Sequence, residues 1–370
     1  ERGEILRRAG SVAEDLLADR AGAIALYKRA VREDDTDTVA LESLDRLYSE
    51  SSDHAALAEV LKRRVELETD PELRSDAALR LGQLSEEYLR DADAAIDAFQ
   101  RVLGDRPNDV TAIVALGRLY ERQARWPDLL ESLRLRAGLA TPSERVTLSF
   151  RAAEVLEREL DDVPEALVAL EGVLALDPRH EPSIQSLVRI ARLEDHRAQA
   201  TAIVVPLLEQ AGRANELAQM LELVAESASD PVEKRDVLRR LAVVHERGRS
   251  DLSSAFEALR RALTEDASDG TLVDEIERVG AALGQWERLA DVLSARALAS
   301  SDPEAARSLY GRVARIAEER LGDDARALEA HKRTLEHVPD DEAALAALDR
   351  LHQKRQEWQE LADVLDRRVQ

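Results

Sequence analysis

The amino-acid sequence predicts an all-α solenoid of antiparallel helical hairpins, with about 21 helices in one continuous array over residues 1–370. Three recurrences predict it. Leucine returns at two positions of one helical face, alanine returns at a third position, and an aspartate stands four residues before each of those alanines. All three return at intervals of about 72 residues, which is the signature of a repeat architecture.

The composition agrees with this fold class. Of 370 residues, 44% are hydrophobic, 34% are charged and only 3% are aromatic. Alanine and leucine must therefore supply most of the core, which suits close-packed helices and disfavours a β-sandwich or a barrel. With 15 glycines and 11 prolines, the chain has little material for long loops.

The recurring leucines place one amphipathic helix in every repeat unit, because residues four apart lie on the same helical face. The two sets are Leu57, Leu129, Leu217, Leu289 and Leu361, and Leu61, Leu133, Leu221, Leu293 and Leu365. In three units a tryptophan opens this helix: Trp126, Trp286 and Trp358. We interpret these tryptophans as residues that pack on the neighbouring turn, with an exposed interface anchor as the alternative.

A second helix starts at the same place in every unit. Its alanines are Ala23, Ala95, Ala166, Ala255 and Ala327, and the preceding aspartates are Asp19, Asp91, Asp162, Asp251 and Asp323. An aspartate just ahead of an apolar-periodic segment is an N-cap, because its carboxylate accepts from free N–H groups of the first turn. Each cap is worth about 1 kcal/mol.

Each unit is predicted to hold four helices, which in the second unit lie near residues 72–90, 92–104, 109–123 and 126–138. The predicted units are residues 1–69, 70–141, 142–229, 230–301 and 302–370. The third unit has about 16 surplus residues, which we assign to an added helix at about 196–211 in which Pro206 starts or kinks the helix. One added helix breaks the hairpin alternation, so we expect the superhelix to bend or change path there.

These residues resemble the tetratricopeptide repeat family over essentially the whole chain. The second unit matches the family pattern of small residue, alanine, aromatic residue and proline at Leu81-Gly82, Ala95, Phe99, Val102 and Pro107, and again at Leu116-Gly117, Tyr120 and Leu129. Two departures are a leucine where the second hairpin should have alanine and the absence of the family's early tryptophan. The resemblance implies a right-handed superhelix with a concave, protein-binding groove, and the composition is similar to that of large bacterial repeat proteins.

Charged residues recur as regularly as apolar ones. The first helix of each unit carries Arg8, Arg80, Arg151, Arg240 and Arg312, and six residues later Glu14, Glu86, Glu157, Glu246 and Glu318. The third helix carries Arg46, Arg118, Arg189, Arg278 and Arg350. Core packing explains apolar recurrence but not charged recurrence, and the family resemblance implies that these positions face the groove.

Two interpretations of the charged recurrence follow. In the first, arginines of one helix pair with glutamates of the next and form a ladder that fixes how the helices stack, although exposed pairs are individually worth well under about 1 kcal/mol. In the second, the arginines form a clamp whose guanidinium groups bind carboxylates of a partner segment. We favour the ladder, because the glutamates recur with the arginines and would neutralise them.

No pattern in the sequence predicts catalysis, a metal site or a cofactor. The chain has no glycine-rich phosphate loop, nucleophile elbow or HExxH zinc pattern, and no cysteine. His331 and His337 are too far apart to share a helical face, so we interpret His331 and His54 as packing or surface residues. The net charge of −23 disfavours nucleic acid as a partner.

The sequence therefore predicts a protein–protein interaction scaffold that binds an extended or helical segment in its groove, or that assembles into a larger complex. The alternatives are a recruitment module of an enzyme whose catalytic domain lies elsewhere, and, less favoured, an RNA-binding helical repeat. The final helix keeps core-type Leu361 and Leu365 with no polar cap after it, so we expect either that the array continues in a longer protein or that its ends meet another chain, for example by end-to-end self-association. No apolar run reaches membrane-spanning length; the sequence leaves localisation open, with the cytoplasm favoured.

Overall fold

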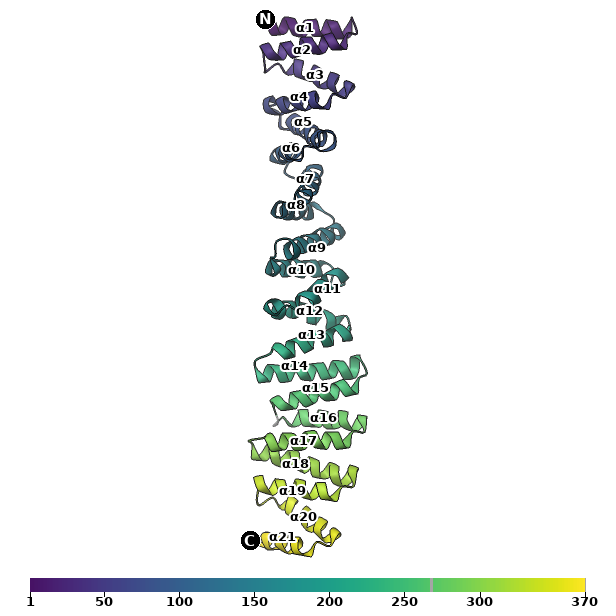
Figure 1. Cartoon of the computed structure of the whole chain (residues 1–370), viewed down its shortest axis with the longest axis vertical. Helices are drawn as coiled ribbons and strands as arrows, with labels where there is room; N and C mark the ends of the chain where they lie inside the picture. The colour runs from purple at the N-terminus through teal and green to yellow at the C-terminus, as the bar shows by residue number, and fades with distance from the viewer. Residues whose placement is uncertain (267–268, 370) are drawn as a thin grey trace. The chain divides into compact units, whose positions relative to one another are not determined.

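The computed structural model describes residues 1–266 and 269–369, which form an all-α solenoid of antiparallel hairpins with 21 α-helices, three π-helical segments, one 3-10 turn and no strand. From α1 to α10 and from α12 to α21, successive helices pack against one another in chain order (Figure 1). The chain divides into two compact units, Glu1–Ser183 and Ile184–Gln370, which we call the N-terminal and C-terminal halves and describe separately.

The N-terminal half contains ten helices and the start of an eleventh. They are α1 (Arg2–Asp15), α2 (Arg20–Glu33), α3 (Thr38–Ser51), α4 (His54–Leu67), α5 (Pro71–Leu84) continued by a π-helical segment (Ser85–Leu89), α6 (Ala92–Asp105), α7 (Val110–Arg122), α8 (Trp126–Leu139), α9 (Pro142–Arg158), α10 (Val163–Leu176) and α11 (Glu181–Ile190). The bounds of α5 to α8 agree with those predicted for the second unit.

The C-terminal half continues the same succession. Its elements are a 3-10 turn (Glu194–His196), α12 (Arg197–Gln210), α13 (Ala214–Ser227), α14 (Pro231–Val243) with a π-helical segment (Val244–Gly248), α15 (Leu252–Glu265), α16 (Gly270–Leu283), α17 (Trp286–Ala299), α18 (Pro303–Ile316) with a π-helical segment (Ala317–Leu321), α19 (Asp324–His337), α20 (Glu342–Arg355) and α21 (Trp358–Val369).

The predicted aspartate caps are present in every unit. Asp91, for example, accepts from the backbone N–H of Ala94 at 3.0 Å, and Asp323 accepts from that of Arg326 at 3.0 Å. The other three recurring aspartates accept in the same way: Asp19, Asp162 and Asp251. One free N–H of the first turn is thereby satisfied in each of these helices.

The predicted alanine positions form the tightest part of the core. All five are fully buried: Ala23, Ala95, Ala166, Ala255 and Ala327. Seven of the ten recurring leucines are buried as well. Leu133 and Leu361 are half-buried, and Leu365 is exposed on the last helix. A methyl group at the alanine position lets two helices approach closely, so the small residue sets the spacing of the stack.

The end of the first helix is wound differently from the prediction of a plain α-helix. In three units it becomes a π-helical turn, with bonds to the fifth residue back, such as Arg90 N–H to the carbonyl of Ser85. The residue just before each aspartate cap has a left-handed backbone, and only one of the five is a glycine: Ala18, Arg90, Asp161, Ser250 and Gly322. Such a turn has no hydrophobic signature, so the sequence pattern could not predict it.

Helix α12 covers the residues at which the added helix was predicted. Pro206 lies inside it rather than at its start, and it has no N–H to donate to the carbonyl of Ala202. Helix α13 begins at Ala214, the position that Trp126 holds in α8. Since α13 is thus the fourth helix of the third unit, α12, which directly precedes it, is the counterpart of the third helix in the other units.

Candidate functional site

Four of the five recurring arginines of the third helices bind a glutamate at the end of a first helix. The pairs within one half are Arg46–Glu14, Arg118–Glu86, Arg278–Glu246 and Arg350–Glu318. Two of them are two-pronged: Arg118 reaches both oxygens of Glu86 at 2.9 and 2.5 Å, and Arg278 reaches both oxygens of Glu246 at 2.5 and 2.7 Å. Three of these glutamates lie in the π-helical segments, whose winding presents the carboxylate to the third helix.

The arginines of the first helices bind backward, to a carboxylate on the third helix of the preceding unit. The pairs are Arg80–Asp45, Arg151–Glu121, Arg240–Glu209 and Arg312–Glu277. The two kinds of pair alternate along each half, and together we call them the arginine ladder. The ion pairs that the ladder interpretation predicts are thus present.

The two sides of a ladder pair differ in exposure. The glutamates of the first set are between 10% and 21% exposed, whereas their arginines are between 53% and 62% exposed. A guanidinium has five N–H donors, and a two-pronged pair uses only two of them. The arginines therefore hold the helices together and still present donors to solvent.

Hydrogen bonding favours the charged forms of Glu246, Arg278 and Arg46 by shifting the pKa of each group. The hydrogen bond with Arg278 lowers the pKa of the Glu246 carboxyl, and the same bond raises the pKa of the Arg278 guanidinium. The hydrogen bond to Glu14 likewise raises the pKa of Arg46. Both members of the Arg278–Glu246 pair therefore hold their charges more firmly in the folded chain.

Three predicted site residues stand apart from these pairs. Arg8 on α1 is exposed and has no ion-pair partner within the described part of the chain. Arg189 donates to the hydroxyl of Ser186 at 3.4 Å. Arg189 and Glu157 lie in different halves, which are described separately.

The tryptophan position packs on the next unit, as predicted for a framework residue. The Arg320 guanidinium lies 4.8 Å from the centre of the Trp286 ring, and the equivalent pair His54–Tyr88 stacks at 4.0 Å between ring centres. Trp126 is half-buried against the core of the N-terminal half. Trp358 is 62% exposed.

His331 joins the ladder rather than a cluster of metal-ligating side chains. Its Nε2 lies 3.4 Å from Glu318, and burial lowers the pKa of its imidazole. At the equivalent place in the first unit the Tyr27 hydroxyl donates to Glu14 at 3.3 Å. The packing role predicted for His331 is therefore observed.

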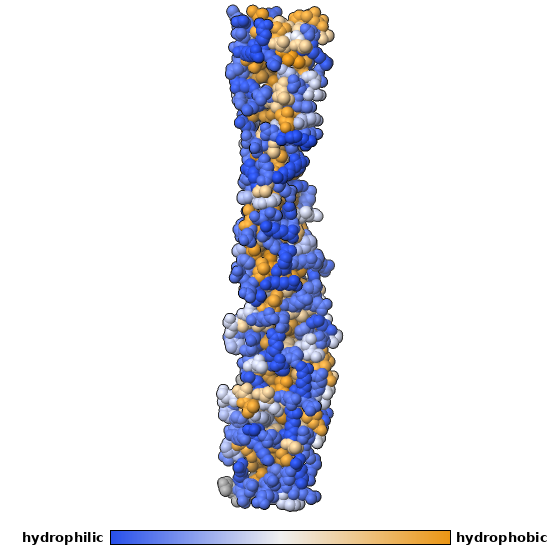
Figure 2. Space-filling model, in the orientation of Figure 1, coloured by the Kyte–Doolittle hydropathy of each residue, from blue (hydrophilic) through white to orange (hydrophobic). Residues whose placement is uncertain are grey.

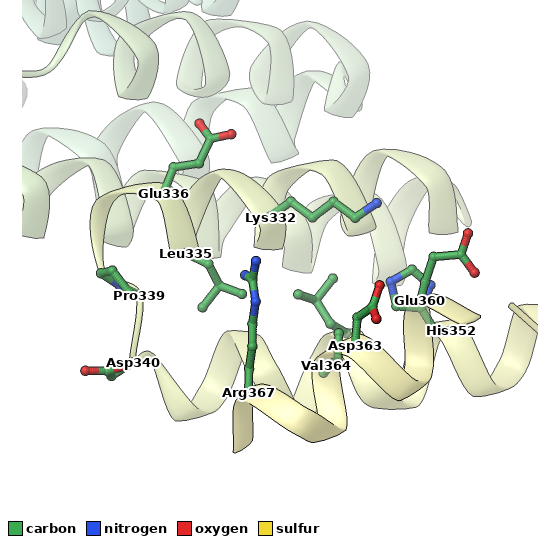
Figure 3. Close-up of a pocket in the computed structure, with 11 residues that line it drawn as sticks. Lys332, Leu335, Glu336, Pro339, Asp340, His352, Glu360, Asp363, Val364 and Arg367 are labelled. Carbon is green, nitrogen blue, oxygen red and sulfur yellow. The ribbon is translucent and has the colours of Figure 1, made fainter. Parts of the chain in front are cut away.

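Two larger cavities lie in the C-terminal half. One, of about 730 Å³, is enclosed by α19, α20 and α21, and Figure 3 shows Leu335, Val364 and Arg367 pointing into the space between these helices. The other, of about 740 Å³, is lined by α12, α13 and α14, and we call it the α12 groove. Its apolar lining includes Val205, Pro206 and Val224, which were not predicted as site residues.

A comparison of each α12 groove residue with its equivalents in the other units could have found this site from the sequence. At the positions of Pro206 and Val224 the other units have arginine. The face of the molecule that Figure 2 shows is mostly hydrophilic, with small hydrophobic areas between polar ones.

Across the described residues, no helix combines the length and apolar character needed to span a membrane.

Comparison with known families gives two matches. A family described as Tetratricopeptide repeat matches residues 76–109, which cover most of α5 and α6, and a second family of the same description matches residues 112–146, which cover α7, α8 and the start of α9. No curated protein matches the chain.

Solved structures with a similar succession of helices exist. One, titled "Structure of Naa15/Naa10 bound to HypK-THB", is 15% identical, with a TM-score of 0.37 over 98% of this chain, and this chain spans only 57% of that one. Two others, titled "Crystal structure of MamA protein" and "Crystal structure of MamA", are each 21% identical, with TM-scores of 0.30 and 0.29 over 48% and 45% of this chain and over 92% and 94% of theirs. With scores this low, they carry no argument about function.

Proposed function

The chain belongs to the tetratricopeptide repeat family, and from this premise we propose that it is a scaffold that holds a segment of a partner protein along the face of its first and third helices. The observation that carries the proposal is the arginine ladder. It ties successive helices together along one face, while the third-helix arginines of the ladder remain more than half exposed. A stiff surface binds with little loss of conformational freedom.

The ladder arginines act mainly between helices in this proposal, and the clamp is the alternative. The glutamates that bind the third-helix arginines are mostly buried, so a partner segment would meet guanidinium groups that are already neutralised. A partner carboxylate could still accept from the remaining donors, which is what the clamp interpretation requires.

Exchanging the two residues of a ladder pair tests whether the pair stabilises the fold and whether its arginine also binds the partner. We expect Arg278→Glu alone to lower the free energy of unfolding by about 1 kcal/mol, because it faces Glu246 with a like charge. The double variant Arg278→Glu with Glu246→Arg restores the ion pair, so stability should return. Cross-linking in source cells captures the partner, and calorimetry then measures its affinity for each variant. The double variant should bind the purified partner with the same affinity as the wild type.

The outcomes separate the two interpretations. A double variant that folds like the wild type but binds the purified partner about tenfold more weakly would establish the clamp. A wild-type chain that captures no protein above a folded control of similar charge would remove the scaffold proposal.

We further propose that the chain associates end to end. At the joint between units, the residue equivalent to Trp358 is covered by the end of the next first helix, as Trp286 is by Arg320. The equivalent of Arg320 in the first unit is Leu16, which directly follows α1 and is 77% exposed. Trp358 of one copy and Leu16 of a second copy are therefore the two halves of a joint that the chain already makes internally, and such a head-to-tail contact can add further copies.

Light scattering after size exclusion tests this association. The apparent mass should rise with concentration for the wild type and stay at that of one chain for Leu16→Asp and for Trp358→Ala. Leu298→Asp changes an exposed leucine away from both faces and should behave as the wild type. A wild type that is monomeric at every concentration would contradict the proposal.

A further inference from the structure

The α12 groove lies where the repeat departs from its own pattern. Pro206 stands where the third helices of the other units have an arginine of the ladder: Arg46, Arg118, Arg278 and Arg350. Val224 stands where the fourth helices of the other units also have arginine: Arg64, Arg136, Arg296 and Arg368. Two invariant charges of the repeat are thus lost together, and both replacements line the same cavity.

A third replacement lies beside them. Val205 occupies the position at which other units have Asp45, Glu277 and Asp349, and the remaining unit has a glycine. Folding does not require these changes, since the three other junctions of a third, a fourth and a following first helix are built with arginine at both positions. Apolar side chains that line a surface groove where other units place charges instead favour contact with another molecule.

The shape of the α12 groove suits a polypeptide segment. Ala198, Ala202 and Pro206 follow one another at intervals of four residues along α12 and are all exposed, so they form a stripe of small residues. The stripe is about 12 Å long at the rise of an α-helix. Leu221 and Val224 of α13 form the opposite wall, and the volume of about 740 Å³ is ample for apolar side chains.

Pro206 also leaves a polar group for a ligand. Because proline has no N–H, the carbonyl of Ala202 lacks the donor that a helix would normally provide. Ala202 and Pro206 both line the α12 groove. A backbone N–H of a bound segment can donate to this carbonyl.

The rim of the α12 groove is acidic. Its carboxylates are Glu194, Asp230 and Glu233, all exposed. Asp230 caps α14 by accepting from the Glu233 N–H at 3.0 Å, and neither Glu194 nor Glu233 has an ion-pair partner among the residues that the structure describes. The two rim arginines are engaged: Arg240 with Glu209 at 2.5 Å, and Arg197 with the carbonyl of Ala191 at 3.3 Å.

From these observations we propose that the α12 groove binds a partner segment that inserts an apolar side chain against Val205, Pro206 and Val224 and is flanked by lysine or arginine. The carboxylates of the rim attract the flanking cations, and the net charge of −23 favours their approach at long range. The proposal rests on the scaffold function and names the place and the chemistry of one of its contacts.

Arginine substitutions at the groove give a test in which the variants should fold. Val224→Arg and Pro206→Arg each restore the residue that four other units have, and both positions lie inside helices, where arginine has a higher helix propensity than valine or proline. Leu298→Arg adds the same charge at an exposed leucine outside the α12 groove and is the matched control. Far-ultraviolet circular dichroism and thermal unfolding verify the fold of all three.

The probe is a displayed library of short random peptides, selected in parallel on the wild type and on Val224→Arg. We expect the wild type alone to enrich peptides in which an apolar residue is flanked by lysine or arginine. By fluorescence anisotropy, a synthetic peptide from this set should bind about tenfold or more weakly to Val224→Arg and to Pro206→Arg, and with unchanged affinity to Leu298→Arg.

Three outcomes would overturn the proposal. Equal enrichment and affinity on the wild type and Val224→Arg would place binding elsewhere on the scaffold. Acidic flanks in the enriched peptides would make the proposed ligand chemistry wrong. Absence of any peptide specific to the wild type would remove the α12 groove as a docking site, and the scaffold proposal would still be decided by the capture of its partner.

Discussion

Phe99→Ala should lower the free energy of unfolding by about 3–5 kcal/mol. Phe99 on α6 is 1% exposed, and its ring lies against Gly82 of α5. A Cβ at Gly82 would come within 2.7 Å of the ring, so the glycine is what allows the two helices to pack so closely over the phenylalanine. Without the ring, a cavity remains that helices held on both sides by their neighbours cannot close.

Urea unfolding followed by circular dichroism measures the loss, and hydrogen exchange of α5 and α6 shows whether it is local, as expected in a repeat array. Tyr88→Ala is the matched control. This tyrosine is exposed and only stacks on His54, so its removal should cost under about 1 kcal/mol. Equal losses in the two variants would show that Phe99 is not a core residue.

Asp45→Ala should lower the free energy of unfolding by about 2–3 kcal/mol. Asp45 is 4% exposed and receives two arginines. Arg80 binds both of its oxygens, at 2.8 and 2.6 Å, and Arg64 forms a second ion pair with it. Removal of the carboxylate leaves two partly buried guanidinium groups without their acceptor at the joint between α3, α4 and α5.

The repeat itself supplies a rescue for this variant. In the second unit, Gly117 takes the position of Asp45. There Arg151 of the next first helix binds Glu121, which lies one turn further along the third helix, at 2.6 Å. Ser49 is the equivalent of Glu121, so Ser49→Glu in the Asp45→Ala background should recover much of the lost stability. Denaturant unfolding of the single and double variants measures the recovery. No recovery would show that the two ladder arrangements are not interchangeable.

Much of the fold could be predicted from the sequence because the apolar positions repeat. The leucine, alanine and aspartate registers located the helices of the second unit to within a residue or two, and the aspartates cap helices as predicted. The π-helical turns were not predicted, because one additional residue in a helical turn changes no hydrophobic position.

The candidate site was only half predictable. The recurrence of arginine and glutamate predicted that these side chains interact, and most of them do. A search for recurring residues does not find Pro206 and Val224, because these two residues differ from the arginines that the other units have at the same positions. Only the structure shows that these two departures, 18 positions apart, line one cavity.

The sequence by itself determined the fold class, the caps and the repeating core of this protein, because those depend on the spacing of residues along one helix and between neighbouring helices. The tertiary structure decided which carboxylate each arginine takes: Arg80 binds Asp45, whereas Arg151 binds Glu121, one turn further along the equivalent helix. It also decided where the ladder gives way to an apolar groove. Ion pairs and grooves depend on the distance between side chains of different helices, which a one-dimensional register does not contain.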